Sequence, residues 1–289
     1  MTRQAAIDRA QSAFDDGSFK RTLQARIERP TESQNPARHA DLLAYLTDSL
    51  QPAFESMGFE CQQLTHPKAK APFLYAQRIE SPHLPTVLGY GHGDVIRGLE
   101  PEWREGVSPW ALTELDGRWY GRGIADNKGQ HSVNLQALAC VLAERGNLGF
   151  NAKYLIEMGE ETGSPGLKEL CQEHAALFKA DLLIASDGPR LSAERPTIFL
   201  GSRGCINFDL SIESRAGAHH SGNWGGLISN PGIQLAHAIG CVVSERGEIK
   251  VPEWKPSALP DAVRRVLADC QVDGVPMDPP LSPIGGNLA

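Results

Sequence analysis

The chain has 289 residues, a length that predicts about two domains. Its 28 basic and 35 acidic residues give a formal net charge of −7, which argues against nucleic-acid phosphates as the main partner. Hydrophobic residues make up 41% and charged residues 22%, so the chain can bury a sizeable core and is not expected to be disordered as a whole.

The cysteines and the hydropathy pattern indicate where the protein works. The six cysteines are widely spaced and form no CxxC pair, which argues against a thiolate zinc site or a redox motif. The N-terminus has no apolar core of a secretory signal, and no stretch approaches the roughly 18 apolar residues of a membrane span. We therefore expect buried, reduced cysteines, no membrane partner and a cytoplasmic location.

Apolar spacing predicts two helices at the start of the chain. The first has Ala6 and Phe14 on its apolar side and ends at Gly17. The second spans residues 38–57, and Pro52 is expected to kink it because proline lacks a backbone donor.

Three short apolar runs then alternate with helical patterns. The runs cover residues 85–91, 151–159 and 181–188, and helices are expected at 130–145 and 165–178. This alternation is typical of an α/β fold with a mostly parallel sheet flanked by helices. Each run ends in polar residues, which should converge because ligands bind beyond the carboxyl ends of parallel strands.

The pattern changes in the last third of the chain. Residues 204–215 alternate like a strand, and residues 230–243 have the pattern of a helix. We therefore expect a domain over residues 1–203 and the start of a second, α+β domain over residues 204–289. The ending at 277–289 is rich in Pro and Gly and is expected to be a poorly ordered tail.

Several strand ends and glycine-rich turns carry acidic or imidazole side chains. His92 precedes Asp94 in GHGD, which suits a metal-binding imidazole oriented by a carboxylate, although a surface turn also explains this tripeptide. Asp126 lies in GRGIADNKG, where the glycines permit a tight turn into a cleft, but it could equally cap the next helix. Asp187 follows the apolar run LLIAS.

Glu160 and Glu161 are adjacent carboxylates directly after an apolar run. Placing both in one cleft is costly without a cation, and with a cation one can bind metal while the other moves a proton. A solvated start to the next helix is the alternative. One imidazole with several carboxylates suits zinc or cobalt and, less well, manganese.

Together, these motifs resemble the M20 metallopeptidases and deacylases. This family includes carboxypeptidase G, carnosinase-like dipeptidases, acetylornithine deacetylase and succinyl-diaminopimelate desuccinylase. YGHGDV, WYGRGIADNKG, MGEETGSPG and SDGP match four family motifs in the same order, and the resemblance covers about residues 85–225. A nucleotide-binding site is set aside because GRGIADNKG lacks the required glycine spacing.

The resemblance implies a fold like that of zinc exopeptidases and a site for two metal ions. His92 and Asp187 would bind one ion, and Asp126 would bridge it to a second. Glu161 would bind that second ion. Zinc is the expected metal, with cobalt or manganese possible.

The resemblance also implies which residues are catalytic. Asp94 would orient the ligand imidazole, and Glu160 would be the general base that deprotonates a water. In similar proteins the peptide bond corresponding to Asp126–Asn127 is cis. The motif HSG matches His220, the counterpart of a lid histidine that reaches the active site of a partner subunit and stabilises the oxyanion. A solvated loop imidazole is the alternative for His220.

The function implied is metal-dependent hydrolysis of amide bonds in dipeptides or N-acyl amino acids. The substrate would be a small molecule, nucleic acids and membranes would not be partners, and the lid would mediate a homodimer. The segment at residues 103–110 and the GSPGL after the glutamates are closer to the dipeptidase-like members.

The chain also departs from the family pattern. The last metal ligand of the family is a histidine near the C-terminus, and His237, the only histidine after His220, lies in a predicted helix. The Pro- and Gly-rich ending matches nothing that we can place in the family. We therefore expect a C-terminally truncated member, with a single-metal hydrolase or an inactive remnant that binds metal or a partner as alternatives.

Overall fold

The protein is represented by a computed structural model that describes residues 3–188, 197–199, 204–255 and 259–269. The chain divides into two compact units, residues 1–200 and residues 201–289, which are described separately. In the described part of the chain, no helix is long and apolar enough to cross a membrane.

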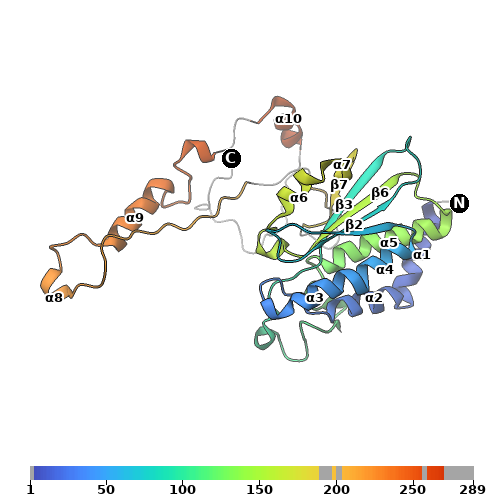
Figure 1. Ribbon diagram of the computed structural model, residues 1–289, viewed down its shortest axis with the longest axis horizontal. Coiled ribbons are helices and arrows are strands. Elements are labelled where there is room, and N and C mark those ends of the chain that lie inside the picture. Colours follow the sequence, from blue (N-terminus) through green and yellow to red (C-terminus); the bar gives the residue numbers. More distant parts are fainter. Residues whose placement is uncertain (1–2, 189–196, 200–203, 256–258, 270–289) are drawn as a thin grey trace. The chain divides into compact units, whose positions relative to one another are not determined.

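The first unit combines helices with a sheet (Figure 1). Its α-helices are α1 (Arg3–Asp15), α2 (Ser18–Ile27), α3 (His39–Ala44), α4 (Gln51–Ser56), α5 (Lys128–Arg145), α6 (Leu167–Glu173) and α7 (Ala175–Phe178). Shorter helical turns are η1 (Pro36–Arg38), the π-helix η2 (Tyr45–Leu50), η3 (Glu100–Glu102) and η4 (Glu160–Thr162). The strands are β1 (Glu60–Leu64), β2 (Phe73–Arg78), β3 (Thr86–His92), β4 (Thr113–Leu115), β5 (Arg118–Tyr120), β6 (Asn151–Glu157) and β7 (Leu182–Ala185).

Five of these strands form the main sheet, in the order β1-β2-β6-β3-β7. β3 runs parallel to both β6 and β7, as the alternating pattern predicts. β1 and β2 were not predicted. They pair antiparallel with each other, because the short connection between them permits no crossover, and β2 also pairs antiparallel with β6. The expected α/β class with flanking helices is therefore confirmed, and the sheet is mixed rather than mostly parallel.

The two faces of the sheet are covered by different helices (Figure 1). Along β2, Leu74 and Ala76 point to one face and Phe73 and Tyr75 to the other, as the two-residue period of a strand requires. The first face packs against the segment from α3 to α4 and against α5. The second face packs against α6 and α7. The carboxyl ends of β3 and β6 emerge between these two layers.

The helix predicted at 38–57 was expected to be kinked at Pro52. In the structure it is interrupted by the π-helix η2, which lies between α3 and α4. Proline has no N–H for the usual helical hydrogen bond, so the preceding turn widens. This helical segment buries Tyr45, Leu46 and Leu50 completely. The π-helix thereby directs Tyr45 toward the start of α5, a contact that matters for the site.

The second unit contains α8 (Ser221–Trp224), α9 (Pro231–Val242), η5 (Pro252–Trp254) and α10 (Asp261–Asp269). Helix α9 confirms the predicted helix. The strand predicted at 204–215 is wrong, because none of those residues is assigned to a strand. Alternating apolar residues form a strand only where a neighbour completes the backbone hydrogen bonds. The predicted tail at 277–289 lies outside the described residues.

Candidate metal centre

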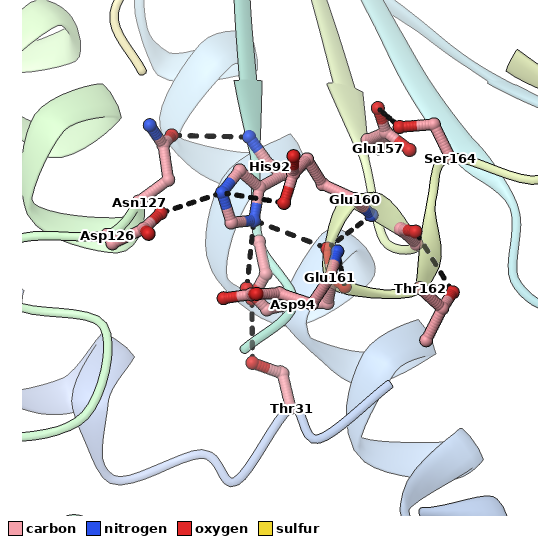
Figure 2. Close-up of polar contacts among 12 residues, drawn as sticks. Thr31, His92, Asp94, Asp126, Asn127, Glu157, Glu160, Glu161, Thr162 and Ser164 are labelled. Atoms are coloured by element: carbon pink, nitrogen blue, oxygen red, sulfur yellow. Dashed lines mark hydrogen bonds and ion pairs between the residues drawn. The ribbon is translucent and has the colours of Figure 1, made fainter. Parts of the chain in front are cut away.

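His92 lies at the centre of the candidate site, at the carboxyl end of β3, and is completely buried. Its Nδ1 lies 3.0 Å from the backbone oxygen of Asp94 and 3.3 Å from the carboxylate of the same residue. Its Nε2 faces Asp126 at 2.9 Å and Glu160 at 3.8 Å (Figure 2). Asp187 lies 3.7 Å from the same nitrogen. The polar residues that follow separate strands therefore converge, as expected.

The electrostatics of this cluster favour a cation. Burial alone would lower the pKa of His92, but its hydrogen bonds to carboxylates, led by Asp126, outweigh burial and raise the pKa to about 12. Burial, followed by the charge of Asp126, raises the pKa of Glu161 to about 7. Burial also raises the pKa of Glu160, and neighbouring carboxylates add to the shift. The cluster thus holds more carboxylates than one imidazolium can neutralise.

Asp94 anchors the Glu160–Glu161 turn as well as the imidazole. Its side chain is buried, and its two carboxylate oxygens accept hydrogen bonds from the backbone N–H groups of Glu160 and Glu161, both at 3.2 Å. The expected proximity to His92 is present in the structure, and no sequence motif indicated the two additional bonds. One buried carboxylate therefore fixes the ligand strand and the glutamate turn relative to each other.

Asp126 is presented by the tight turn that precedes α5. The Asp126–Asn127 peptide bond is cis, as the resemblance implies. Gly129 makes this turn possible, because a Cβ at that position would lie only 1.7 Å from the backbone oxygen of Ile124. Asp126 points toward the imidazole of His92 (Figure 2). The glycine-rich context therefore aims this carboxylate into the site.

The donor set fits a divalent cation. His92, Asp126 and Asp187 form one group, and His92, Glu160 and Glu161 form another, with one potential ligand atom per residue within 4.8 Å of the others in each group. Imidazole nitrogen with carboxylate oxygen is a ligand combination that zinc and related ions accept. Across the described residues, the two groups share a single imidazole, and none joins Asp126 to Glu161.

Glu157 is a buried carboxyl next to the site that sequence analysis missed. It accepts hydrogen bonds from the hydroxyls of Tyr90, at 2.5 Å, and Ser164, at 2.9 Å. Burial raises its pKa despite these donors. Ser164 closes the Glu160–Glu161 turn, so this bond ties the turn to β6 (Figure 2). The sequence signal that could have identified Glu157 is a single acidic residue within the apolar run NAKYLIEMG.

His220 belongs to the second unit, where it is exposed and accepts the backbone N–H of Gly222 at 3.0 Å, capping α8. His237 is also exposed, within α9. The oxyanion role expected for His220 stays a prediction.

Comparison with known proteins establishes the family. The profile of peptidase family M20/M25/M40 matches residues 88–288. The chain belongs to this family. The match ends at residue 288, so it includes almost all of the Pro- and Gly-rich ending at 277–289, which the motifs alone did not place in the family.

The similar curated proteins include several dipeptidases. The Beta-Ala-His dipeptidase of Mus musculus is 31% identical over 247 residues, which cover 81% of this chain and 50% of the relative. The cysteinylglycine-S-conjugate dipeptidase of Corynebacterium striatum is 35% identical over 169 residues, or 58% of this chain and 36% of the relative. The chain thus spans half or less of the length of these two relatives.

Solved structures of M20 peptidases share the fold. An M20 family metallo-carboxypeptidase from Sulfolobus solfataricus matches with a TM-score of 0.72 and 26% identity, covering 88% of this chain and 57% of the other. Human carnosine dipeptidase 1 matches with a TM-score of 0.68 and 23% identity, covering 94% and 59%. The fold expected from the motifs is therefore confirmed.

Proposed function

We propose that this protein is a metal-dependent hydrolase that cleaves the amide bond of dipeptides. The observation that carries the proposal is the convergence of Asp126, Glu160 and Asp187 on Nε2 of His92, in a chain that belongs to the M20 family. The similarity to dipeptidases supports dipeptides over N-acyl amino acids. Zinc is the proposed metal, with cobalt or manganese as alternatives, because the cluster supplies one imidazole and several carboxylates.

The residues would divide the work as follows. His92, Asp126, Glu161 and Asp187 would hold the metal, which when bound would polarise the substrate carbonyl and lower the pKa of water. Glu160 would take a proton from that water as the new C–O bond forms. It would return the proton to the amine nitrogen as the C–N bond breaks. Its carboxylate lies 3.8 Å from Nε2 of His92, close enough to the candidate ligands to suit this role.

The test uses the full 289-residue chain. The protein is loaded with Zn²⁺, Co²⁺ or Mn²⁺, desalted, and assayed for metal content and for hydrolysis of β-Ala-His, Cys-Gly and N-acetyl amino acids. We expect Glu160→Gln to retain metal and to lower dipeptide hydrolysis by about 10²–10⁴-fold. Glu105→Gln, at an exposed glutamate outside the site, is the control and should be unaffected.

Each outcome separates the candidates. Equal hydrolysis by the wild type and Glu160→Gln would exclude Glu160 as the base. Faster cleavage of N-acetyl amino acids than of dipeptides would identify a deacylase. A wild type that binds no metal and hydrolyses nothing would support the inactive remnant, and one bound metal with activity would support a single-metal enzyme.

We further propose that the second unit mediates a homodimer and supplies His220 as an oxyanion donor. The family membership of residues 204–269 supports this assignment. The mass in solution, measured by light scattering, tests the dimer directly. The described cysteines are all unpaired, which supports a reducing, cytoplasmic compartment.

A further inference from the structure

His131 is a buried histidine that belongs to neither group of candidate metal ligands. It lies in the first half of α5 and is completely buried. Its Nε2 lies 2.7 Å from the hydroxyl of Tyr45, which the π-helix η2 directs toward it. Its Nδ1 lies 3.2 Å from Oδ1 of Asn127. Both ring nitrogens are therefore used, and the second connection leads toward the candidate metal centre.

The neighbours of Asn127 fix the direction of these hydrogen bonds. Oδ1 of Asn127 lies 3.2 Å from the backbone N–H of His92, which can only donate. Nδ2 lies 2.5 Å from the backbone oxygen of Ser186, which can only accept. With the amide in this orientation, Nδ1 of His131 must donate to Oδ1. Nε2 is then free to accept from the hydroxyl of Tyr45.

Asn127 touches three segments that carry candidate metal ligands. It is covalently joined to Asp126 and accepts the backbone N–H of His92 (Figure 2). Its Nδ2 also donates to the backbone of Ser186 and lies 3.3 Å from Oδ1 of Asp187. A rotation of this one amide would therefore disturb the positions of His92, Asp126 and Asp187 together.

The packing around the amide leaves little room for such a rotation. Gly91 precedes His92 on β3, and a Cβ at Gly91 would lie 2.9 Å from Oδ1 of Asn127 and 3.2 Å from Cβ of His131. Both distances are shorter than ordinary van der Waals contact. The start of α5 therefore approaches the backbone of β3 as closely as a glycine allows.

We propose that Tyr45 and His131 are positioning residues that hold the amide of Asn127, and through it the candidate metal ligands, in one geometry. They act through Asn127 and touch neither substrate nor metal. The inference rests on the proposed metal site and adds to it a set of supporting hydrogen bonds that no sequence motif marks. Supporting hydrogen bonds of this kind commonly affect metal affinity by about 10–100-fold.

A pair of amide substitutions separates positioning from packing. In His131→Asn, the side-chain nitrogen can replace Nδ1 and still donate to Asn127. In His131→Gln, the longer amide replaces Nε2, so it keeps the contact with Tyr45 but loses the donor toward Asn127. Both variants exchange an aromatic ring for a buried amide, so each serves as the control for the loss of core packing in the other.

The first readout is binding of Co²⁺, followed by its visible absorption, in the full chain. We expect His131→Gln to bind Co²⁺ about 10–100-fold more weakly than the wild type, with an altered spectrum. His131→Asn should stay within about threefold of the wild type. Equal losses in both variants, in proportion to their fall in melting temperature, would overturn the proposal.

The second readout needs no metal. The backbone N–H of His92 bonds to Oδ1 of Asn127, so its hydrogen exchange, measured by NMR on the metal-free protein, reports the position of that amide. Exchange should accelerate at least tenfold in His131→Gln and remain near the wild-type rate in His131→Asn. Unchanged exchange in His131→Gln would overturn the positioning role. A wild type that binds no Co²⁺ would instead overturn the proposed metal site, and the exchange comparison would still decide the positioning.

Tyr45→Phe provides a milder variant if His131→Gln does not fold. It removes one hydroxyl from a ring that stays packed in the core. His131 then loses its partner at Nε2 but can still donate to Asn127, so we expect Co²⁺ affinity to fall about three- to tenfold and exchange at His92 to accelerate. Wild-type values for both measurements would exclude Tyr45 from the positioning role.

Discussion

At the scale of single residues, Glu161 makes the metal-free protein sensitive to pH. Its pKa is raised from 4.5 to about 7, chiefly by burial and next by Asp126. A carboxyl with a raised pKa binds its proton more tightly in the folded protein than in the unfolded chain. The stability that it contributes is therefore complete below about pH 4.5 and is lost as the pH rises through 7.

Urea unfolding of metal-free wild type and Glu161→Gln tests this prediction. Glutamine does not titrate, so the difference between the two free energies of unfolding isolates the carboxyl. We expect the wild type to lose about 1 kcal/mol relative to Glu161→Gln between pH 4.5 and 7.5, after allowance for solvent screening of a partly exposed group. A difference that is constant over this range would contradict the prediction.

Lys128 contributes stability rather than chemistry. It is completely buried, and its Nζ donates to the backbone oxygens of Arg26, at 3.0 Å, and Arg29, at 2.7 Å, joining α5 to the end of α2. We expect Lys128→Met to lower the free energy of unfolding by about 2 kcal/mol, because one buried and one partly buried backbone oxygen lose their donor. Urea denaturation measures the change.

Lys153 offers a matched control for Lys128. Its Nζ also donates to two backbone oxygens, at 2.7 and 2.8 Å, but the side chain is only partly buried. Water can replace the lost donor there, so Lys153→Met should cost less than about 1 kcal/mol. Equal costs for the two variants would mean that burial of the oxygens is not the cause.

At the scale of elements, the connection between the end of β3 and the turn η4 depends on Asp94. Asp94→Asn keeps the shape of the side chain but gives up one of the two acceptors for the turn. We expect Co²⁺ affinity to fall about tenfold or more, because Glu160 and Glu161 lose their fixed position. Thr31→Val is the control, since Thr31 donates to Gly93 near the same strand end without touching the turn. Equal effects of both changes would contradict this role.

The elements that sequence analysis predicted correctly are those whose signal is local. The apolar runs of β3, β6 and β7 and the long pattern of α5 are visible in any short window of sequence. β1 was missed because its sequence, ECQQL, is mostly polar and is a strand only through pairing with β2. The strand predicted at 204–215 was wrong for the opposite reason: the apolar alternation is present, but no strand among the described residues pairs with it.

The same distinction applies to the candidate site. His92, Asp126 and Asp187 were predicted because each lies in a short motif that follows an apolar run or lies in a glycine-rich turn. Tyr45 and His131 were not, because a buried hydrogen bond between residues 86 positions apart leaves no mark in either segment. The candidate metal ligands could therefore be predicted from the sequence. The residues proposed to position them could be identified only in the three-dimensional structure.

At the scale of the whole molecule, the proposed metal would join separate parts of the first unit. Its candidate ligands lie after β3, after β6, after β7 and in the turn before α5. A bound cation would therefore stabilise the folded arrangement over the unfolded chain. At a metal concentration about 100 times the dissociation constant, the gain is about 2.7 kcal/mol. We expect removal of metal with EDTA to lower the melting temperature by about 5–10 °C. His92→Asn should melt at the same temperature with and without metal, and a wild type insensitive to EDTA would contradict the prediction.

The order of strands in the sheet also bears on how the protein is made. β3 lies between β6 and β7, and both of these neighbours are synthesised later. Roughly a hundred residues separate His92 from Asp187, so a ribosome adding about 5–20 residues per second leaves the site unfinished for on the order of ten seconds. During that interval β3 exposes unpaired backbone edges on the nascent chain. β3, an interior strand of the finished sheet, is thus a segment that needs protection by chaperones during translation.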